Sequence, residues 1–287
     1  MQLIESMVDT ACWSAIFRAE ENERSDALFR DRWARELAGE RGARILKAIP
    51  LGPCDSWSPA VRTHLIDRMV MQCIEREGVD LVLNLGAGYC MRPYRMFLPK
   101  TLRWIEADFP TLIEEKNARL ASQEPACRLE RVGLDIRIGV DRRALLNRLG
   151  GQCKRGMVIT EALLFHFTAG EIGEIGGDLA GQGRFAFWTA DIMNPAMLVI
   201  FKYAMNRHLE SAGADLHFAP AGGPGFFRRM GWEPREAHSI FREAARLRRL
   251  CPWLRGVSLA PDAPPWMPFI PWMGACLFGR PAANIGV

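Results

Sequence analysis

Residues Asp80 to Pro110 read DLVLNLGAGYCMRPYRMFLPKTLRWIEADFP, and this stretch determines the fold that we expect. It begins with an apolar run, Leu81–Leu85, which is short and aliphatic enough for a buried parallel strand. The small residues of Gly86–Gly88 follow at once, and they let the backbone turn sharply and approach a ligand closely. A strand followed by such a turn predicts a ligand site at the end of the strand.

A second strand is expected at Leu102–Ile105, and Glu106 and Asp108 follow at its carboxyl end. Doubly wound α/β folds bind nucleosides with glycines after the first strand and an acid after the second. The glycines pass under the ligand, and the carboxylate accepts hydrogen bonds from the ribose hydroxyls. The sequence therefore predicts a nucleoside-binding site.

Two features of the turn indicate which nucleoside is bound. Met91 stands where the third glycine of the dinucleotide fingerprint G-x-G-x-x-G would be. The bulky segment Arg92–Arg95 then crowds the place where a helix amino terminus would meet a pyrophosphate. A cofactor without phosphate, such as S-adenosylmethionine (SAM), fits better. A chance G-A-G turn is the alternative, but the acid about twenty residues further on favours a functional turn.

Composition sets the broad class of protein. The chain has 287 residues, of which 49% are hydrophobic, and its net charge is only +4. It can therefore bury a sizeable core, and its charge gives little support for a nucleic-acid partner. The eight cysteines include no C-x-x-C pair, so neither a zinc site nor a disulfide framework is expected. Without a signal-peptide pattern or a long apolar run, we expect a cytoplasmic protein with no bound metal and no membrane contact.

Strand and helix patterns alternate through the middle of the chain. Further strands are expected at 128–134, 156–160 and 185–189, and further helices at 111–122, 141–149 and from Thr168 onward, where T-x-x-E forms a capping box. This alternation predicts an α/β fold with a mostly parallel sheet and helices on both faces.

We expect one domain over residues 1–287. It would have an N-terminal helical cover (1–78), a cofactor-binding core (79–190), a lid or substrate insertion (191–260) and a C-terminal strand region (261–287). The apolar segment from Asp191 to His217 is expected to be helical, as a lid over a hydrophobic substrate or as an extension of the core. A short helix is expected at 226–231 and a last strand at 272–278. The arginine-rich segment 242–255 is interpreted as a solvated helix face.

Seven short motifs occur in order along the chain. They are F-R-x-E (Phe17–Glu20), L-F-x-D-x-x-A (Leu28–Ala34), R-T-x-x-x-D (Arg62–Asp67), L-G-A-G-x-x-x-R-x-Y-R (Leu85–Arg95), E-x-D-x-P (Glu106–Pro110), L-D-I (Leu134–Ile136) and E-x-L-L (Glu161–Leu164). Together they resemble the leucine carboxyl methyltransferase family, in particular its branch of bacterial polyketide and natural-product O-methyltransferases. The resemblance implies a class I SAM-dependent methyltransferase fold, which is Rossmann-like.

The resemblance also implies a role for each residue that matches a family motif. Ordered by the part of SAM that each would contact, they are Arg62 (carboxylate), Gly86, Ala87 and Gly88 (methionine), Asp108 (ribose), Asp135 with the Ile136 amide (adenine) and Glu161 (amino group). Glu106 is the alternative ribose ligand. For each acid, a helix cap or a surface salt bridge is the alternative role.

One position departs from the family pattern. The family commonly has G-x-D-x-R, and Cys90 stands here in place of the aspartate. The change removes a carboxylate close to the expected cofactor. It raises the alternative that the SAM site supports other chemistry or no catalysis.

Methyl transfer requires that the acceptor oxygen be positioned, and a hydroxyl acceptor also benefits from a base. His166 lies just past Glu161 and is the candidate base, with a structural histidine as the alternative. We expect a SAM-dependent O-methyltransferase that acts on a carboxylate or a phenol or enol hydroxyl of a small, largely apolar natural product such as a polyketide. A methyltransferase acting on a protein carboxyl terminus or modified RNA is one alternative, and a SAM-binding scaffold without transfer is the other. The oligomeric state stays open.

Overall fold

The computed structural model describes residues 7–48, 56–209, 215–251, 254–256 and 264–281, with side chains left out at 7, 48 and 204–209. Within these ranges one seven-stranded sheet has the order β3-β2-β1-β4-β5-β7-β6. Its strands are β1 (Leu81–Leu85), β2 (Arg103–Asp108), β3 (Arg128–Gly133), β4 (Gly156–Thr160), β5 (Phe185–Met193), β6 (Glu233–Ser239) and β7 (Met273–Gly279). Neighbouring strands from β3 to β5 are parallel, whereas β7 runs antiparallel to both β5 and β6.

Helices cover both faces of this sheet. They are α1 (Met7–Asn22), α2 (Ala34–Ala48), α3 (Trp57–Glu77), α4 (Arg92–Arg95), α5 (Pro110–Arg119), α6 (Gly139–Gly150), α7 (Ala169–Gly181), α8 (Pro195–Leu209) and α9 (Ile240–Arg246), with 3-10 helices η2 (Leu164–His166) and η4 (Gly223–Met230). The expected α/β fold with a mostly parallel sheet is confirmed. No helix in the described ranges has both the length and the apolar run that a membrane span needs.

Alternation along the strands builds two hydrophobic layers. In β1, Val82 packs on one face of the sheet in a cluster that includes Leu65 and Met69 of α3. Leu83 of the same strand packs on the other face, in a cluster that includes Ile175 of α7. Because successive side chains of a strand point to opposite faces, a continuous apolar run is what a strand buried on both faces requires.

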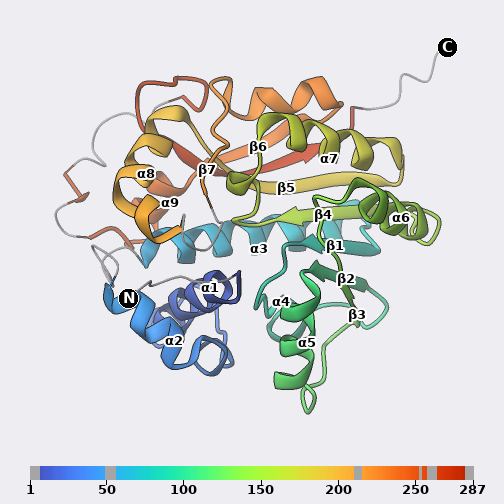
Figure 1. Cartoon of the computed structure of the whole chain (residues 1–287), viewed down its shortest axis with the longest axis horizontal. Helices are drawn as coiled ribbons and strands as arrows, with labels where there is room; N and C mark the ends of the chain where they lie inside the picture. Colours follow the sequence, from blue (N-terminus) through green and yellow to red (C-terminus); the bar gives the residue numbers. More distant parts are fainter. Residues whose placement is uncertain (1–6, 49–55, 210–214, 252–253, 257–263, 282–287) are drawn as a thin grey trace.

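The N-terminal helices form a third layer. Ile16 of α1 and Leu37 of α2 are buried in a separate cluster that also contains Tyr89 and Met91, from the turn after β1. In Figure 1 the arrow of β4 points toward the side of the molecule where α1 and α8 lie. The α1–α2 pair therefore packs against the turn at the carboxyl edge of the sheet.

The helix start predicted at Thr168 is confirmed. In the capping box before α7, the Thr168 amide donates to Glu171 Oε2 at 2.7 Å, and the Thr168 hydroxyl accepts from the Glu171 amide at 3.3 Å. The second strand is longer than predicted, because β2 continues through Asp108. Glu106 and Asp108 thus belong to the strand itself rather than following it.

The prediction for Asp191 to His217 is wrong at both ends. Residues 191–193 are the last part of β5, so Asp191 lies in the sheet, and the helix α8 begins only at Pro195. Residues 215–219 are not helical, and 210–214 lie outside the described residues. The strand continues because Ile192 and Met193 still pair with β7.

The region 226–255 also differs from its prediction. The expected short helix is present as η4, but the edge strand β6 was not predicted. The helical part of the arginine-rich segment is short, because α9 ends at Arg246. Arg249 is no solvated side chain: it is buried, and its Nη2 lies 2.9 Å from Glu21 Oε1 of α1. This ion pair joins the end of the α9 region to the N-terminal helices.

Candidate functional site

A cavity of about 520 Å³ opens at the carboxyl ends of β1, β2 and β4. Its wall also includes residues of α1, α3, α8 and the loop after β3. All residues that the sequence singled out for the cofactor and for catalysis line it: Arg62, Gly86, Ala87, Gly88, Asp108, Asp135, Ile136, Glu161 and His166. The fold thus brings together residues that are up to 104 positions apart, from 62 to 166.

The turn after β1 is joined to the end of β2 by Asp108. The amide of Gly88 donates to Asp108 Oδ2 at 2.7 Å, and the amide of Phe109 donates to Oδ1 at 2.8 Å. Burial raises the pKa of Asp108, although these two amide donors oppose the rise. Gly86 has φ +64°, and a Cβ there would lie 2.7 Å from Leu163 Cδ1. Both the backbone conformation and the close approach therefore require glycine at this position.

Glu106, the alternative ribose ligand, lies elsewhere. Its carboxylate is fully buried and forms ion pairs with Lys116 Nζ at 2.8 Å and Arg131 Nε at 2.9 Å. It does not line the cavity, whereas Asp108 does. Of the two acids on β2, one therefore stabilises the packing of α5 and β3, and the other faces the candidate site.

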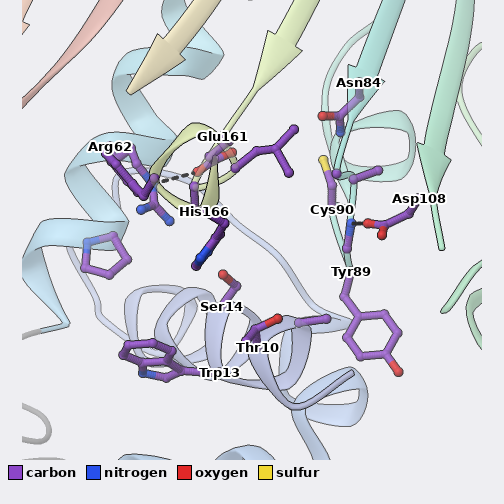
Figure 2. A pocket seen from close by; sticks show the side chains of 18 of the residues that line it. Thr10, Trp13, Ser14, Arg62, Asn84, Tyr89, Cys90, Asp108, Glu161 and His166 are labelled. Atoms are coloured by element: carbon purple, nitrogen blue, oxygen red, sulfur yellow. Dashed lines mark hydrogen bonds and ion pairs between the residues drawn. The ribbon is translucent and has the colours of Figure 1, made fainter. Parts of the chain in front are cut away.

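A network of ion pairs connects α3, α4, β4 and β5. Arg62 Nε lies 3.2 Å from Glu161 Oε1, and Arg92 Nη1 lies 2.6 Å from Glu161 Oε2. The hydroxyl of Thr63 donates to Glu161 Oε1 at 2.7 Å. Burial alone would raise the pKa of Glu161, but Arg92 and then Arg62 outweigh it and hold the pKa well below its usual range. Glu161 is therefore an ionised carboxylate between the guanidinium groups of Arg62 and Arg92. Figure 2 shows its ion pair with Arg62.

Two further acids of this network were not singled out from the sequence. Asp191 is fully buried, with Oδ2 3.3 Å from Arg62 Nη1 and Oδ1 accepting the amide of Ala162 at 2.7 Å. Ala162 has φ 55°, an unfavourable conformation for a residue with a side chain. Asp67 lies 2.7 Å from both Arg92 Nε and Arg95 Nη1. The signal that could have identified Asp191 is a charged residue inside the otherwise apolar sequence FAFWTADIM.

The predicted adenine end lies on the loop after β3. Asp135 Oδ2 lies 2.6 Å from Arg137 Nη2, and the hydrogen bonds from the Arg137 side chain lower the pKa of Asp135 despite some burial. The carbonyl of Ile136 accepts from Arg142 Nη1 at 2.7 Å. Arg137 also lies over the ring of Phe109, 5.5 Å from its centroid. These contacts hold the loop beside Asp108.

His166 of η2 lines the cavity. In Figure 2 its ring lies between the Arg62–Glu161 pair and α1, on the side of Ser14. Its Nδ1 lies 3.2 Å from the carbonyl oxygen of Asp215. Since a carbonyl only accepts hydrogen bonds, this contact favours the tautomer that carries its proton on Nδ1. Nε2 is then the basic nitrogen.

Cys90 lines the cavity at the position of the family aspartate. Its Sγ lies 3.5 Å from Arg92 Nη1, and its carbonyl accepts from Lys116 Nζ at 2.8 Å. Arg92 nevertheless retains two carboxylate partners, Asp67 and Glu161. Arg92 therefore keeps its ion pairs although Cys90 carries no carboxylate.

One end of the cavity is lined mainly by apolar side chains. Six of them pack in one hydrophobic cluster: Trp13 of α1, Phe165 of η2, Met193, Phe201, Leu216 and Met273. Two other aromatic residues from the same part of the chain lie elsewhere. Tyr203 is 94% exposed, and Phe218 is buried against Phe226 with ring centroids 5.0 Å apart.

Comparison with known proteins identifies the family. The sequence pattern of the leucine carboxyl methyltransferase family matches residues 11–175, more than half of the chain, and the chain therefore belongs to this family. A protein of Streptomyces coelicolor named "Putative S-adenosyl-L-methionine-dependent methyltransferase" is 34% identical over 140 residues, which is 45% of this chain and 48% of that protein. A protein of the same name from Mycobacterium bovis is 33% identical over 153 residues. The chain spans about half the length of the curated relatives that it matches.

Solved structures show the same fold at low sequence identity. A protein of the DUF574 family from Streptomyces avermitilis superposes with a TM-score of 0.59 at 11% identity, over 93% of this chain and 97% of that chain. A structure from Thermobifida fusca described as "a putative methyltransferase" has a TM-score of 0.53 at 14% identity, over 93% and 94% of the two chains. The fold is that of the class I methyltransferases, as the sequence motifs predicted.

Proposed function

We propose that this protein is a SAM-dependent O-methyltransferase whose acceptor is a carboxylate or hydroxyl of a small, largely apolar molecule such as a polyketide. One observation carries the proposal: the Asp108–Gly88 turn and the Arg62–Glu161 pair line a single cavity at the carboxyl edge of the sheet. Ligands of doubly wound folds bind at this edge. Family membership and the names of the relatives support the coarser part of the proposal, a SAM-dependent methyltransferase.

The donor set fits SAM group by group. Each oxygen of Asp108 accepts one backbone amide, and a carboxylate has room for about two further donors, as ribose hydroxyls would supply. Arg62 and Glu161 provide opposite charges for the carboxylate and the ammonium of the methionine part. Nη2 of Arg92, buried at this wall, lacks a hydrogen-bond partner among the described residues, so the wall also offers a donor for a ligand oxygen.

When bound, SAM would supply an electrophilic methyl carbon. The residues of this chain would then orient the acceptor, exclude water and move a proton. His166 lines the cavity, and its Nε2 would take the proton of a hydroxyl acceptor. The apolar wall that includes Trp13 and Phe201 would exclude water from the reacting atoms.

A second candidate is a SAM-binding protein without methyl transfer, and Cys90 in place of the family aspartate is the observation that favours it. A macromolecular acceptor, such as a protein carboxyl terminus or modified RNA, is the third. A cavity of about 520 Å³ with an apolar wall suits a small molecule better. We therefore propose a small-molecule partner, without nucleic acid or membrane, in the cytoplasm.

Calorimetric titration with SAM and with S-adenosylhomocysteine tests the proposal, after mass spectrometry has excluded co-purified cofactor. We expect both to bind at one site per chain. A labelled-methyl assay with phenols and carboxylic acids then tests transfer. Binding without transfer to any acceptor would favour the second candidate, and a folded protein that binds neither compound would contradict a SAM site altogether.

A further inference from the structure

The acceptor end of the cavity differs in charge from the cofactor end, and this difference bears on which oxygen is methylated. Every arginine that lines the cavity has a carboxylate partner within 3.3 Å. The pairs are Arg18 with Asp31, Arg62 with Glu161 and Asp191, Arg92 with Asp67 and Glu161, Arg95 with Asp67, and Arg137 with Asp135. The described lining includes no lysine.

An anionic acceptor would need a cation or several donors when it leaves water. Moving a carboxylate into an apolar site is costly unless the charge is paired and hydrogen-bonded. The residues around the apolar end, such as Trp13, Phe201 and Leu216, carry no charge. The proposed function assigns Arg62 to the carboxylate of SAM, and Arg18, which also lines the cavity, is already paired with the buried Asp31. Among the described residues, a second carboxylate at this end would therefore find no cation without a carboxylate partner.

Two polar side chains face each other across this apolar end. Figure 2 shows the hydroxyl of Ser14, on α1, directed toward the ring of His166, on η2. The backbone carbonyl of Ser14 accepts from Arg18 Nη1 at 3.2 Å, and Arg18 Nε lies 2.9 Å from the buried Asp31. These contacts fix the turn of α1 that carries Ser14. A hydroxyl between Ser14 and Nε2 of His166 would find one donor and one base.

We propose that the acceptor is an uncharged aromatic hydroxyl compound, whose hydroxyl is held between Ser14 and His166, and not a carboxylic acid. This inference rests on the proposed function and selects one of its two acceptor classes. The hydroxyl proton passes to Nε2 of His166, the oxygen bonds to the methyl carbon as the carbon–sulfur bond breaks, and the electron pair of that bond stays on sulfur. Ser14 positions the oxygen and exchanges no proton in this step.

The test compares 2-naphthol with 2-naphthoic acid, which share one ring system and differ in charge at pH 7, where a phenol is neutral and a carboxylic acid is ionised. The protein is saturated with S-adenosylhomocysteine, and binding is followed by calorimetry and by the fluorescence of tryptophan, since Trp13 lines the cavity. We expect naphthol to bind at least roughly tenfold more tightly, the scale of an unpaired buried charge. Equal or tighter binding of naphthoic acid would overturn the inference. So would binding of neither compound.

Two substitutions sharpen the test. Ser14→Ala should weaken naphthol binding by roughly fivefold, the effect of one neutral hydrogen bond, and leave S-adenosylhomocysteine binding unchanged. Phe201→Arg places a cation at the apolar end and should reverse the preference toward naphthoic acid, in a variant shown by its thermal transition to be folded. Unchanged naphthol affinity in Ser14→Ala would show that Ser14 does not bind the hydroxyl of the acceptor. Failure of S-adenosylhomocysteine to bind wild-type protein would instead count against the proposed function.

Discussion

The two ends of the cavity are built in different ways. The cofactor end is charged, and its acids and arginines sit at the ends of strands or on the helices packed against them, where Asp108, Glu161 and Asp191 are fixed by short hydrogen bonds. The acceptor end is apolar, and it is assembled from α1, η2, α8 and the start of β7. Strand ends are held in register by the whole sheet, whereas the acceptor end depends on contacts between separate elements. The structure therefore places the charged groups on rigid parts and forms the apolar wall mainly from helices and loops.

The largest effect on the free energy of unfolding is expected when a charge is removed from the network at the cofactor end. Glu161→Gln leaves Arg62 and Arg92 without their shared carboxylate. Removing one partner of a buried pair typically costs about 3–5 kcal/mol, and we expect a loss of this size in the free energy of unfolding, measured with urea. Glu130→Gln is the control, because Glu130 pairs with Arg148 on the surface and should change stability by about 0–1 kcal/mol. Similar losses in the two variants would contradict a special role of the network.

The second prediction concerns the affinity for SAM, which Asp108→Ala should lower. If the carboxylate accepts two ribose hydroxyls, its loss should weaken SAM binding by roughly a hundredfold or more, since hydrogen bonds to charged groups contribute about 1.5–3 kcal/mol each. Calorimetry gives the affinity. The matched control is Asp141→Asn, an exposed acid in the first turn of α6 that does not line the cavity. Unchanged affinity in Asp108→Ala would withdraw the ribose assignment.

The pH dependence of SAM binding should reflect the same carboxylate. Burial raises the pKa of Asp108, so in the folded protein it takes up a proton at a higher pH than an ordinary aspartate. The ionised form accepts the ribose hydroxyls, and affinity should therefore fall as pH falls through this raised pKa. Titrations between about pH 8 and about pH 4 would follow this loss. The same decline of SAM affinity with falling pH in Asp108→Asn would show that another group causes it.

A pair of glycine substitutions gives the smallest effects. Gly86→Ala should lower the free energy of unfolding by about 1–2 kcal/mol, because an alanine at φ +64° is strained and its Cβ approaches Leu163. Gly173→Ala, in the middle of α7 with open space around its Cβ, should instead raise it by about 0.5–1 kcal/mol. Urea midpoints of the two variants should thus shift in opposite directions. A shift in the same direction would show that the turn after β1 is not constrained.

Most of the charged end of the cavity could be predicted from the sequence. β1 and β4 are continuous apolar runs, and the turn and acids that follow strands were placed at the right edge of the sheet. Asp191 was assigned to the wrong element because no local signal marks the end of β5, which is set by its pairing with β7. The roles of the lining residues toward SAM remain predictions.

The acceptor end was less predictable, because distant packing forms it. Nothing in the sequence of α1 marks Ser14, whose position opposite His166 follows from how α1 lies on the turn after β1. The edge strand β6 was missed because its sequence, EPREAHS, is mostly polar and contains no apolar run. Arg249 resembled a surface residue until its pairing with Glu21 placed it in the interior.

The sheet order has a consequence for how the chain folds during synthesis. β7 leaves the ribosome after β6 but inserts between β5 and β6, so the outer edge of β5 has no partner until residues 273–279 emerge. An unpaired hydrophobic edge is prone to association with other chains. Late, long-range pairing of this kind also slows folding, because the intervening chain must be ordered before the contacts form. Ribosome-bound chains that end before Met273 are thus expected to engage chaperones, and chains extended beyond Gly279 to be released from them.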